Sequence, residues 1–371
     1  MLSFIRFIYQ IRPLVAVLLA LFVGSGLILL AGESPVTAYK ELFAGAFLDY
    51  YGIADTLTKM SPILLAGLAV AIPLRAGLFN IGAEGQIYVG ALFSSAAALY
   101  LPEMPAWIHI PICIIFGAIG GGLWALIPAY LKAYKGINEV IVTILMNYIG
   151  INMVSYFASG PMMQEGAPYP YSPEISEQLW LPWVMPGTDA HIGVVIGVAL
   201  ALFTWIFMRY TTGGFRIDMV GKNQRAASYA GVNVRRQIIL CMVIAGAIAG
   251  LAGTFEVMGL KYRLYHMFSP GYGYDGIVVA FLAGLNPILV PLSALFLSGL
   301  KVGALIMQRS IGLESTVIEA VQGLVIVFVA ASLAFRFDAS KWRAILAKRK
   351  VLNDAIDIGS NQTQTTTGKE G

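Results

Sequence analysis

Two charged side chains and three glycines stand between two apolar stretches, in the run Arg75-Ala-Gly-Leu-Phe-Asn-Ile-Gly-Ala-Glu-Gly-Gln86. A charge at the centre of a membrane helix costs about 2.5 to 3.5 kcal/mol on insertion scales. We therefore expect these polar groups to face protein or a water-accessible route, where Asn80, Glu84 and Gln86 could contact a polar solute. A cytoplasmic turn with ordinary helix caps is the alternative interpretation.

A second polar feature is a stripe along the apolar run 140–164. Tyr148, Asn152 and Ser155 recur at helical spacing, with Asn147 beside them, so one helix face carries amides and hydroxyls. Interhelical hydrogen bonding explains such a stripe, and so does a path for an uncharged polar solute. The candidate path residues are Asn80, Glu84, Gln86, Asn147 and Asn152.

The basic connection at about 209–237 holds a third feature, the run Arg225-Ala-Ala-Ser-Tyr-Ala-Gly231. Good helix formers precede Gly231, which is a plausible C-terminal cap. A short helix here would bring Ala226 and Ala227 against a groove in another protein. The flanking positive charges also fit orientation signals or contacts with lipid headgroups.

Composition places these features in a membrane protein. Of 371 residues, 58% are hydrophobic and 12% are charged, whereas soluble domains carry about 25% charged residues. No Gly-x-x-x-x-Gly-Lys-Ser/Thr run is present, so any ATP chemistry must come from a partner. Cys113 and Cys241 lie in apolar runs and the three histidines are isolated. We therefore predict no metal site, no catalytic residues and no enzyme activity of its own.

Charge-free runs predict an all-α polytopic fold of about ten segments, since one span needs roughly 20 apolar residues. The predicted segments are 13–32, 60–74, 85–102, 104–131, 140–164, 190–208, 237–255, 276–285, 288–306 and 320–335. The eighth is short and ends at Asn286-Pro287, where proline breaks a helix. It is therefore expected to be a short or re-entrant helix, shielded from lipid by protein.

Lysine and arginine collect on the cytoplasmic side of membrane proteins, which predicts that both termini are inside. The opposite loop at about 160–190 carries acidic residues but no Lys or Arg, and its prolines and aromatics predict an ordered outer cap. Glu256 and Glu319 fall near the outer ends of their segments and are expected at the interface. Residues 1–350 form a single predicted transmembrane domain, and the Gln/Thr/Gly-rich tail 351–371 is predicted to be disordered.

Glycines spaced for close helix packing occur in two predicted segments. Gly117 and Gly121 form one GxxxG pattern, and Gly246 and Gly250 form another. Such patterns let two helix backbones approach closely. We expect a tight bundle.

Three stretches, 77–86, 221–253 and 273–287, resemble permease subunits of bacterial ABC importers in the group serving branched-chain amino acids, simple sugars and nucleosides. The sugar/nucleoside type is the most similar. The middle stretch resembles the loop that docks into the ATPase, usually written Glu-Ala-Ala-x-x-x-Gly. Arg225 replaces the glutamate here, while Ala226, Ala227 and Gly231 keep the spacing.

The resemblance implies about ten helices in two inversely related halves and a location in the bacterial inner membrane. It implies three kinds of partner: a cytoplasmic ABC ATPase that hydrolyses the ATP, an external solute-binding protein, and a second permease subunit, homologous or identical. No cofactor of its own and no nucleic-acid partner are expected. The implied solute is a nucleoside or a simple sugar.

An ion-coupled secondary transporter of a polar solute is the alternative function. Such a transporter would place ionisable residues near mid-membrane, and most of the predicted segments have none. The sequence therefore favours an ATP-driven importer.

Overall fold

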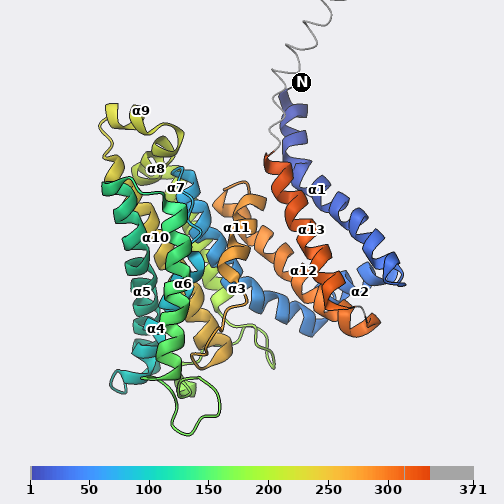
Figure 1. The fold of residues 1–371 in the computed structure, drawn as a ribbon, viewed down its shortest axis with the longest axis horizontal. Coiled ribbons are helices and arrows are strands. Elements are labelled where there is room, and N and C mark those ends of the chain that lie inside the picture. Colours follow the sequence, from blue (N-terminus) through green and yellow to red (C-terminus); the bar gives the residue numbers. More distant parts are fainter. Residues whose placement is uncertain (1, 313, 335–371) are drawn as a thin grey trace, which may run out of the picture. The chain divides into compact units, whose positions relative to one another are not determined.

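Helices account for nearly all the regular structure of residues 2–312 and 314–334, the part of the chain that the computed structural model describes (Figure 1). In lipid each backbone polar group must be paired within its own segment, which favours helices. In chain order the helices are α1 (Leu2–Leu30), α2 (Pro35–Phe47), α3 (Tyr50–Arg75), α4 (Ala83–Tyr100), α5 (Ala106–Lys135), α6 (Glu139–Ser159), α7 (Gly193–Tyr210), α8 (Thr212–Lys222), α9 (Gln224–Tyr229), α10 (Val234–Glu256), α11 (Tyr272–Leu282), α12 (Val290–Ile311) and α13 (Ser315–Ala334). Three short turns, η1 (Glu177–Leu179), η2 (Val257–Lys261) and η3 (Pro287–Leu289), complete the described elements.

Each of the ten predicted segments falls on a helix, so the all-α polytopic fold is confirmed. Fewer than ten helices qualify as membrane spans when each is judged by its length and apolarity. Six described helices are long and apolar enough to cross a membrane, and a seventh span results if α1 and α2, bent by 119°, count as one. The predicted segments that do not meet these criteria include α11, which has 11 residues, and α4, which carries polar side chains.

Helix α4 is polar because protein, not lipid, surrounds it. It packs against α5, α6 and α10, and the buried residues along it include Glu84, Gln86, Ser94 and Ser95. A helix enclosed in this way does not need an apolar surface. By contrast, only 28% to 33% of the most apolar stretch of α5, α6 and α7 is buried inside the protein, against 83% for α3. The core therefore lies around α3, α4 and α10.

The predicted close packing of small residues is confirmed between α5 and α10. A Cβ atom added to Gly121 would lie 2.2 Å from the Gly246 carbonyl oxygen, and one added to Gly250 would lie 2.2 Å from the Gly117 oxygen. Only glycine fits at such a backbone contact. These helices, with α4 beside them, form the tightly packed side of the bundle.

The predicted short helix is α11, and unusual backbone flanks it on both sides. Gly271 precedes it with φ +100°, and Gly284 and Leu285 follow it with φ +59° and +60°. Upstream, α10 runs into the π-helical turn η2. This broken region places the start of α11 inside the bundle, against α3 and α4.

Residues 1–330 form one compact unit, and a second unit begins at Ala331. The chain beyond Ala334, which includes the predicted tail 351–371, lies outside the described residues.

Candidate functional site

A pair of buried amides shapes the connection between α3 and α4. Asn80 Nδ2 donates to Gln86 Oε1 at 3.1 Å, and Gln86 Nε2 donates back to Asn80 Oδ1 at 3.2 Å. Asn80 Oδ1 also accepts the Gly82 N–H at 3.1 Å. Both side chains are buried. The pair fixes the turn from which α4 begins.

Asn147 reaches the same turn from α6. Its Oδ1 accepts the Gly85 N–H at 2.8 Å, and its Nδ2 donates to the Ile81 carbonyl at 2.9 Å. The first N–H groups of a helix have no partner within the helix. Asn147 therefore acts as a capping residue supplied by a neighbouring helix.

Glu84 joins the start of α4 to the start of α11. Its Oε2 accepts the Gly273 N–H at 2.6 Å. A Cβ atom at Gly273 would lie 2.3 Å from the Glu84 nitrogen, so these two helix starts touch through their backbones. The contact depends on glycine at position 273.

Four of the five candidate path residues thus form one buried polar cluster of Asn80, Glu84, Gln86 and Asn147. Asn152 is separate from it. It lies on an exposed face of α6, where its Nδ2 donates to the Tyr148 carbonyl at 2.7 Å. The cluster's polar atoms bond to the chain itself and hold the α4–α11 junction.

Helix α8 is fastened to the end of α3, directly before this cluster. The Arg75 guanidinium donates to both carboxylate oxygens of Asp218, at 2.8 and 2.5 Å. A Cβ atom at Gly221 would lie 1.9 Å from the Arg75 carbonyl oxygen. The sequence analysis missed Asp218, although it is the only acidic residue in the basic stretch 209–236.

The short helix predicted in the basic connection is α9. Asn223 caps its start by accepting the N–H groups of Arg225 and Ala226 at 3.0 and 3.1 Å. Gly231, with φ +80°, follows its end as expected. Ala227 is buried in the chain's own fold, whereas Tyr229 is 93% exposed. The large outward-facing side chain of this helix is therefore Tyr229.

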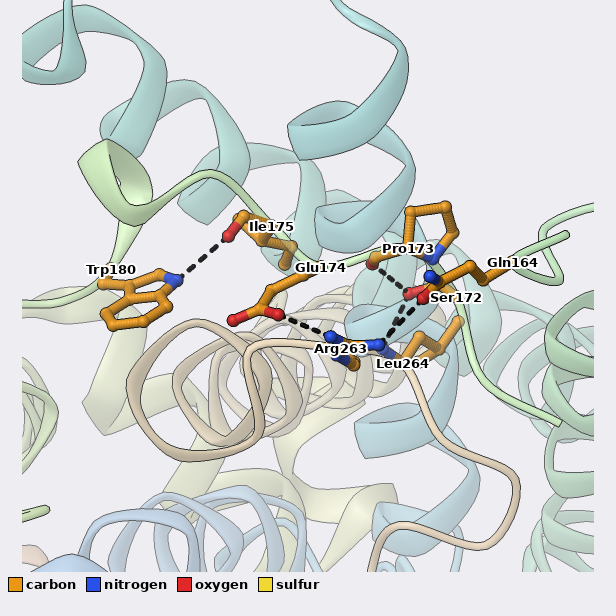
Figure 2. A network of polar contacts seen from close by, with 8 residues as sticks. All are labelled: Gln164, Ser172, Pro173, Glu174, Ile175, Trp180, Arg263 and Leu264. Carbon is orange, nitrogen blue, oxygen red and sulfur yellow. Dashed lines mark hydrogen bonds and ion pairs between the residues drawn. The ribbon is translucent and has the colours of Figure 1, made fainter. Parts of the chain in front are cut away.

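The acidic loop at about 160–190, predicted to be an outer cap, is ordered because it pairs with the segment before α11. Figure 2 shows this network. Ser172 N donates to the Leu264 carbonyl at 3.0 Å, and Leu264 N donates to Ser172 Oγ at 3.0 Å. Arg263 donates to Gln164 Oε1 at 2.8 Å and to Glu174 Oε2 at 2.5 Å.

Trp180 closes the same network. Its ring stacks on Tyr262 with centroids 4.0 Å apart. Its Nε1 donates to the Ile175 carbonyl at 3.0 Å (Figure 2). The outer loop is thereby fixed to the segment that leads into α11. A movement of this loop would reach the α4–α11 junction through a short length of chain.

Ionisable side chains inside the bundle were also missed by the sequence analysis. Lys301, halfway along α12, donates to Asp275 Oδ2 at 2.5 Å. Glu256 is 1% exposed and accepts the Tyr272 hydroxyl at 3.2 Å, so protein encloses this carboxylate at the end of α10. Segment limits were drawn at charged residues, which removed Lys59 and Asp275 from their helices. Lys301 lies inside the predicted segment 288–306, and this charge could have revealed that ionisable side chains are buried in the bundle.

Known proteins similar to this chain are permease components of transport systems. Residues 52–330 match the family described as branched-chain amino acid transport system / permease component. The chain is 39% identical over 343 residues to the guanosine ABC transporter permease protein NupP of Bacillus subtilis, covering 91% of this chain and 97% of the relative. It is 32% identical over 345 residues to the nucleoside ABC transporter permease protein NupB of Lactococcus lactis, covering 90% and 94%.

A third relative carries a different solute in its name. The glucose ABC transporter permease protein TsgB13 of Haloferax volcanii is 34% identical over 353 residues, covering 92% of each chain. All three similarities extend over nearly the full length, and the family match runs from α3 into α13. This chain is a multi-pass membrane protein that belongs to the permease family of branched-chain amino acid transport systems.

Proposed function

We propose that this chain is the transmembrane subunit of an ATP-driven import complex that carries a nucleoside or a simple sugar. The observation that carries this proposal is the near full-length similarity to permeases named for guanosine, nucleosides and glucose. An external solute-binding protein delivers the solute, and a second permease subunit, homologous or identical, completes the channel.

Partner subunits hydrolyse the ATP, and the exposed α8–α9 region is where a cytoplasmic ATPase docks. Within the motif of Arg225, Ala226, Ala227 and Gly231, the side chains of Arg225 and Ala226 are exposed. Tyr229 adds a large surface for contact between them and Gly231. The Arg75–Asp218 pair then carries a movement of α8 to the α3–α4 connection.

The chain crosses the bacterial inner membrane in ten segments, with both termini in the cytoplasm. Length and apolarity alone leave out α13, the enclosed helix α4 and the short α11. The polar groups of α4 and α11 are buried against protein, which supports counting these two at membrane depth.

The solute path runs beside the cluster of Asn80, Glu84, Gln86 and Asn147 and continues along α6 at Asn152. A neutral solute needs replacement hydrogen bonds on leaving water, because an unsatisfied hydroxyl or amide costs roughly 2 to 7 kcal/mol. For the path to open in turn to the two sides of the membrane, the first turns of the helices that border it must move. The cluster joins the first turns of α4 and α11.

The test is uptake by the complete complex reconstituted into liposomes, with guanosine and glucose as probes. ATP-driven import should require ATP and the binding protein, and it should continue after ionophores collapse H+ and Na+ gradients. Uptake by this chain alone, driven by an ion gradient, would contradict the proposal and support a secondary transporter.

A further inference from the structure

A polar pocket of about 210 Å³ lies beside the start of α11, and none of the candidate path residues lines it. It lies among α3, α11, α12 and α13. The polar side chains that line it are Lys59, Tyr272, Lys301, Gln308, Glu319 and Gln322. Tyr272 faces this pocket while its neighbour Gly273 binds Glu84. The pocket and the buried cluster therefore share one turn of α11.

Charged side chains at these positions inside membrane helices carry a large energetic cost. Lys59 lies well inside α3, and Lys301 lies halfway along α12. Ionisable residues inside membrane helices are expensive and usually mark a substrate or ion pathway. Among the described residues, Lys59 has no carboxylate within ion-pair distance, whereas Lys301 pairs with Asp275. An ammonium group is thus available at the pocket wall.

The charges around the pocket indicate what it can hold. The lining contains the cationic Lys59 and Lys301 and the anionic Glu319, and the carboxylates of Asp275 and Glu256 contact the lining residues Lys301 and Tyr272. Charged groups of both signs therefore border the pocket, which offers both donors and acceptors. The amides of Gln308 and Gln322 add one donor group and one acceptor each. Neutral molecules with several hydroxyl groups match this lining.

The volume limits the size of the ligand. A space of 210 Å³ corresponds to about seven water molecules at about 30 Å³ each. Pockets for drug-sized ligands measure about 300 to 1,000 Å³. The part of a ligand that lies inside the pocket is therefore about the size of a single hydroxylated ring.

We propose that this pocket holds the hydroxyl-bearing ring of the transported solute, which is the ribose of a nucleoside or the ring of a free monosaccharide. The inference rests on the proposed import function and adds the site that recognises the solute during passage. Lys59, Gln308 and Gln322 donate to ring hydroxyls, and Glu319 accepts from them. Glu256 positions the Tyr272 phenol at the wall.

The experiment removes single amides and measures import by the complete complex. Gln308→Leu and Gln322→Leu keep similar side-chain volume, and leucine favours membrane insertion, so loss of import would not arise from failed insertion. Lys135→Met, at an exposed end of α5, is the matched control. The probes are guanosine and glucose, each measured for uptake and for ATP hydrolysis stimulated by the binding protein.

Each glutamine variant should import a transported probe about five- to tenfold more slowly, the effect of losing one hydrogen bond. Stimulated ATP hydrolysis should stay within twofold of wild type, and Lys135→Met should behave as wild type in both assays. Loss with guanosine alone assigns the ring to a nucleoside, loss with glucose alone assigns it to a free sugar, and loss with both assigns the site to either ring.

Unchanged uptake in both glutamine variants would overturn the inference while leaving the import function intact. Loss of uptake together with loss of assembly or of ATP hydrolysis would also overturn it, because the amides would then be structural. A wild-type complex that imports neither probe contradicts the proposed function itself.

Discussion

His191 lies enclosed within the bundle, just before α7. Its Nδ1 accepts the Gly193 N–H at 3.1 Å, and a Cβ atom at Gly259 would lie 2.5 Å from its ring. Its Nε2 is buried without a partner among the described residues. Burial disfavours the charged imidazolium and lowers the pKa of His191 to about 4. This side chain folds in its neutral form.

The stability of the protein should therefore fall as the pH falls from 6.5 toward 4. The unfolded histidine binds a proton near pH 6.5, while the folded one stays neutral until about pH 4, so protons favour the unfolded state in that window. Between pH 7 and 5 the loss is about 2 kcal/mol. Thermal unfolding in detergent at both pH values measures it.

His191→Gln should lose most of this pH dependence, because glutamine does not titrate. His266→Gln removes a histidine from the neighbouring loop and controls for that change. A His191→Gln protein whose unfolding temperature falls with pH as steeply as wild type would show that other groups are responsible.

Single residues of the candidate cluster were predictable from the sequence, but their partners were not. Asn80, Glu84 and Gln86 stood out because polar side chains are costly between two apolar runs. That Asn80 bonds to Gln86 depends on the backbone of the turn, and that Glu84 bonds to Gly273 depends on packing between distant helices. Asn147 and Asn152 share a predicted helix face, yet only Asn147 faces the cluster.

At the scale of elements, α8 is joined to α3 by one ion pair and one glycine contact. Asp218→Asn should weaken the bidentate contact with Arg75, and a hydrogen bond to a charged group contributes about 1.5 to 3 kcal/mol. If α8 transmits ATPase movements, this loss should reduce coupling by roughly 13- to 150-fold. The number of ATP molecules hydrolysed per solute imported is the measurement.

The exchanged pair Arg75→Asp with Asp218→Arg should restore part of the coupling, which separates the ion pair from a general effect on folding. Lys222→Gln, at the exposed end of α8, is the control. An Asp218→Asn complex with wild-type ATP use per solute would remove this contact from the transmission route.

The outer loop is held by two kinds of contact of different strength. The Arg263–Glu174 pair involves a carboxylate side chain that is 46% exposed, and exposed ion pairs contribute about 0 to 1 kcal/mol. The Trp180–Tyr262 stack joins aromatic burial to a hydrogen bond, and aromatic pairs add about 0.5 to 1.5 kcal/mol beyond their buried area.

Trp180→Ala should therefore loosen the loop far more than Glu174→Gln. Hydrogen exchange of the amides of Ser172, Ile175 and Leu181, which bond to the segment 258–264, is the measurement. We expect at least about tenfold faster exchange in Trp180→Ala, equivalent to about 1.4 kcal/mol, and a change below about fivefold in Glu174→Gln. The reverse order would mean that the ion pair dominates.

Elements were predictable wherever apolar runs were uninterrupted, and not where polar residues are buried. The runs of α5, α6 and α7 face outward over much of their surface and gave clear signals. Helix α2 and the first part of α3 were missed, because Lys40, Asp55 and Lys59 interrupt the apolar pattern. Charged residues can occur inside helices when protein covers them, which a hydropathy pattern does not reveal.

For the whole molecule, the proposed topology predicts which positions reach the outside. A maleimide reagent that does not cross membranes should label Glu174→Cys in intact cells and should not label Lys222→Cys. Both native cysteines, Cys113 and Cys241, are buried, so background labelling should be low. Opening the membrane should make Lys222→Cys reactive. Labelling of Lys222→Cys in sealed cells would reverse the orientation.

The enclosed polar helix α4 has a consequence for how the protein is made. During synthesis α4 leaves the ribosome well before α10, one of the helices that cover it. Until α10 arrives, the side chains of Gln86, Ser94 and Ser95 lack part of their protein shell and face the insertion machinery or lipid. The nascent chain must therefore retain α4 beside α3 and α5 instead of releasing it. Chains truncated before Val234 should accordingly be degraded rapidly in cells, which pulse-chase labelling measures against the full-length protein.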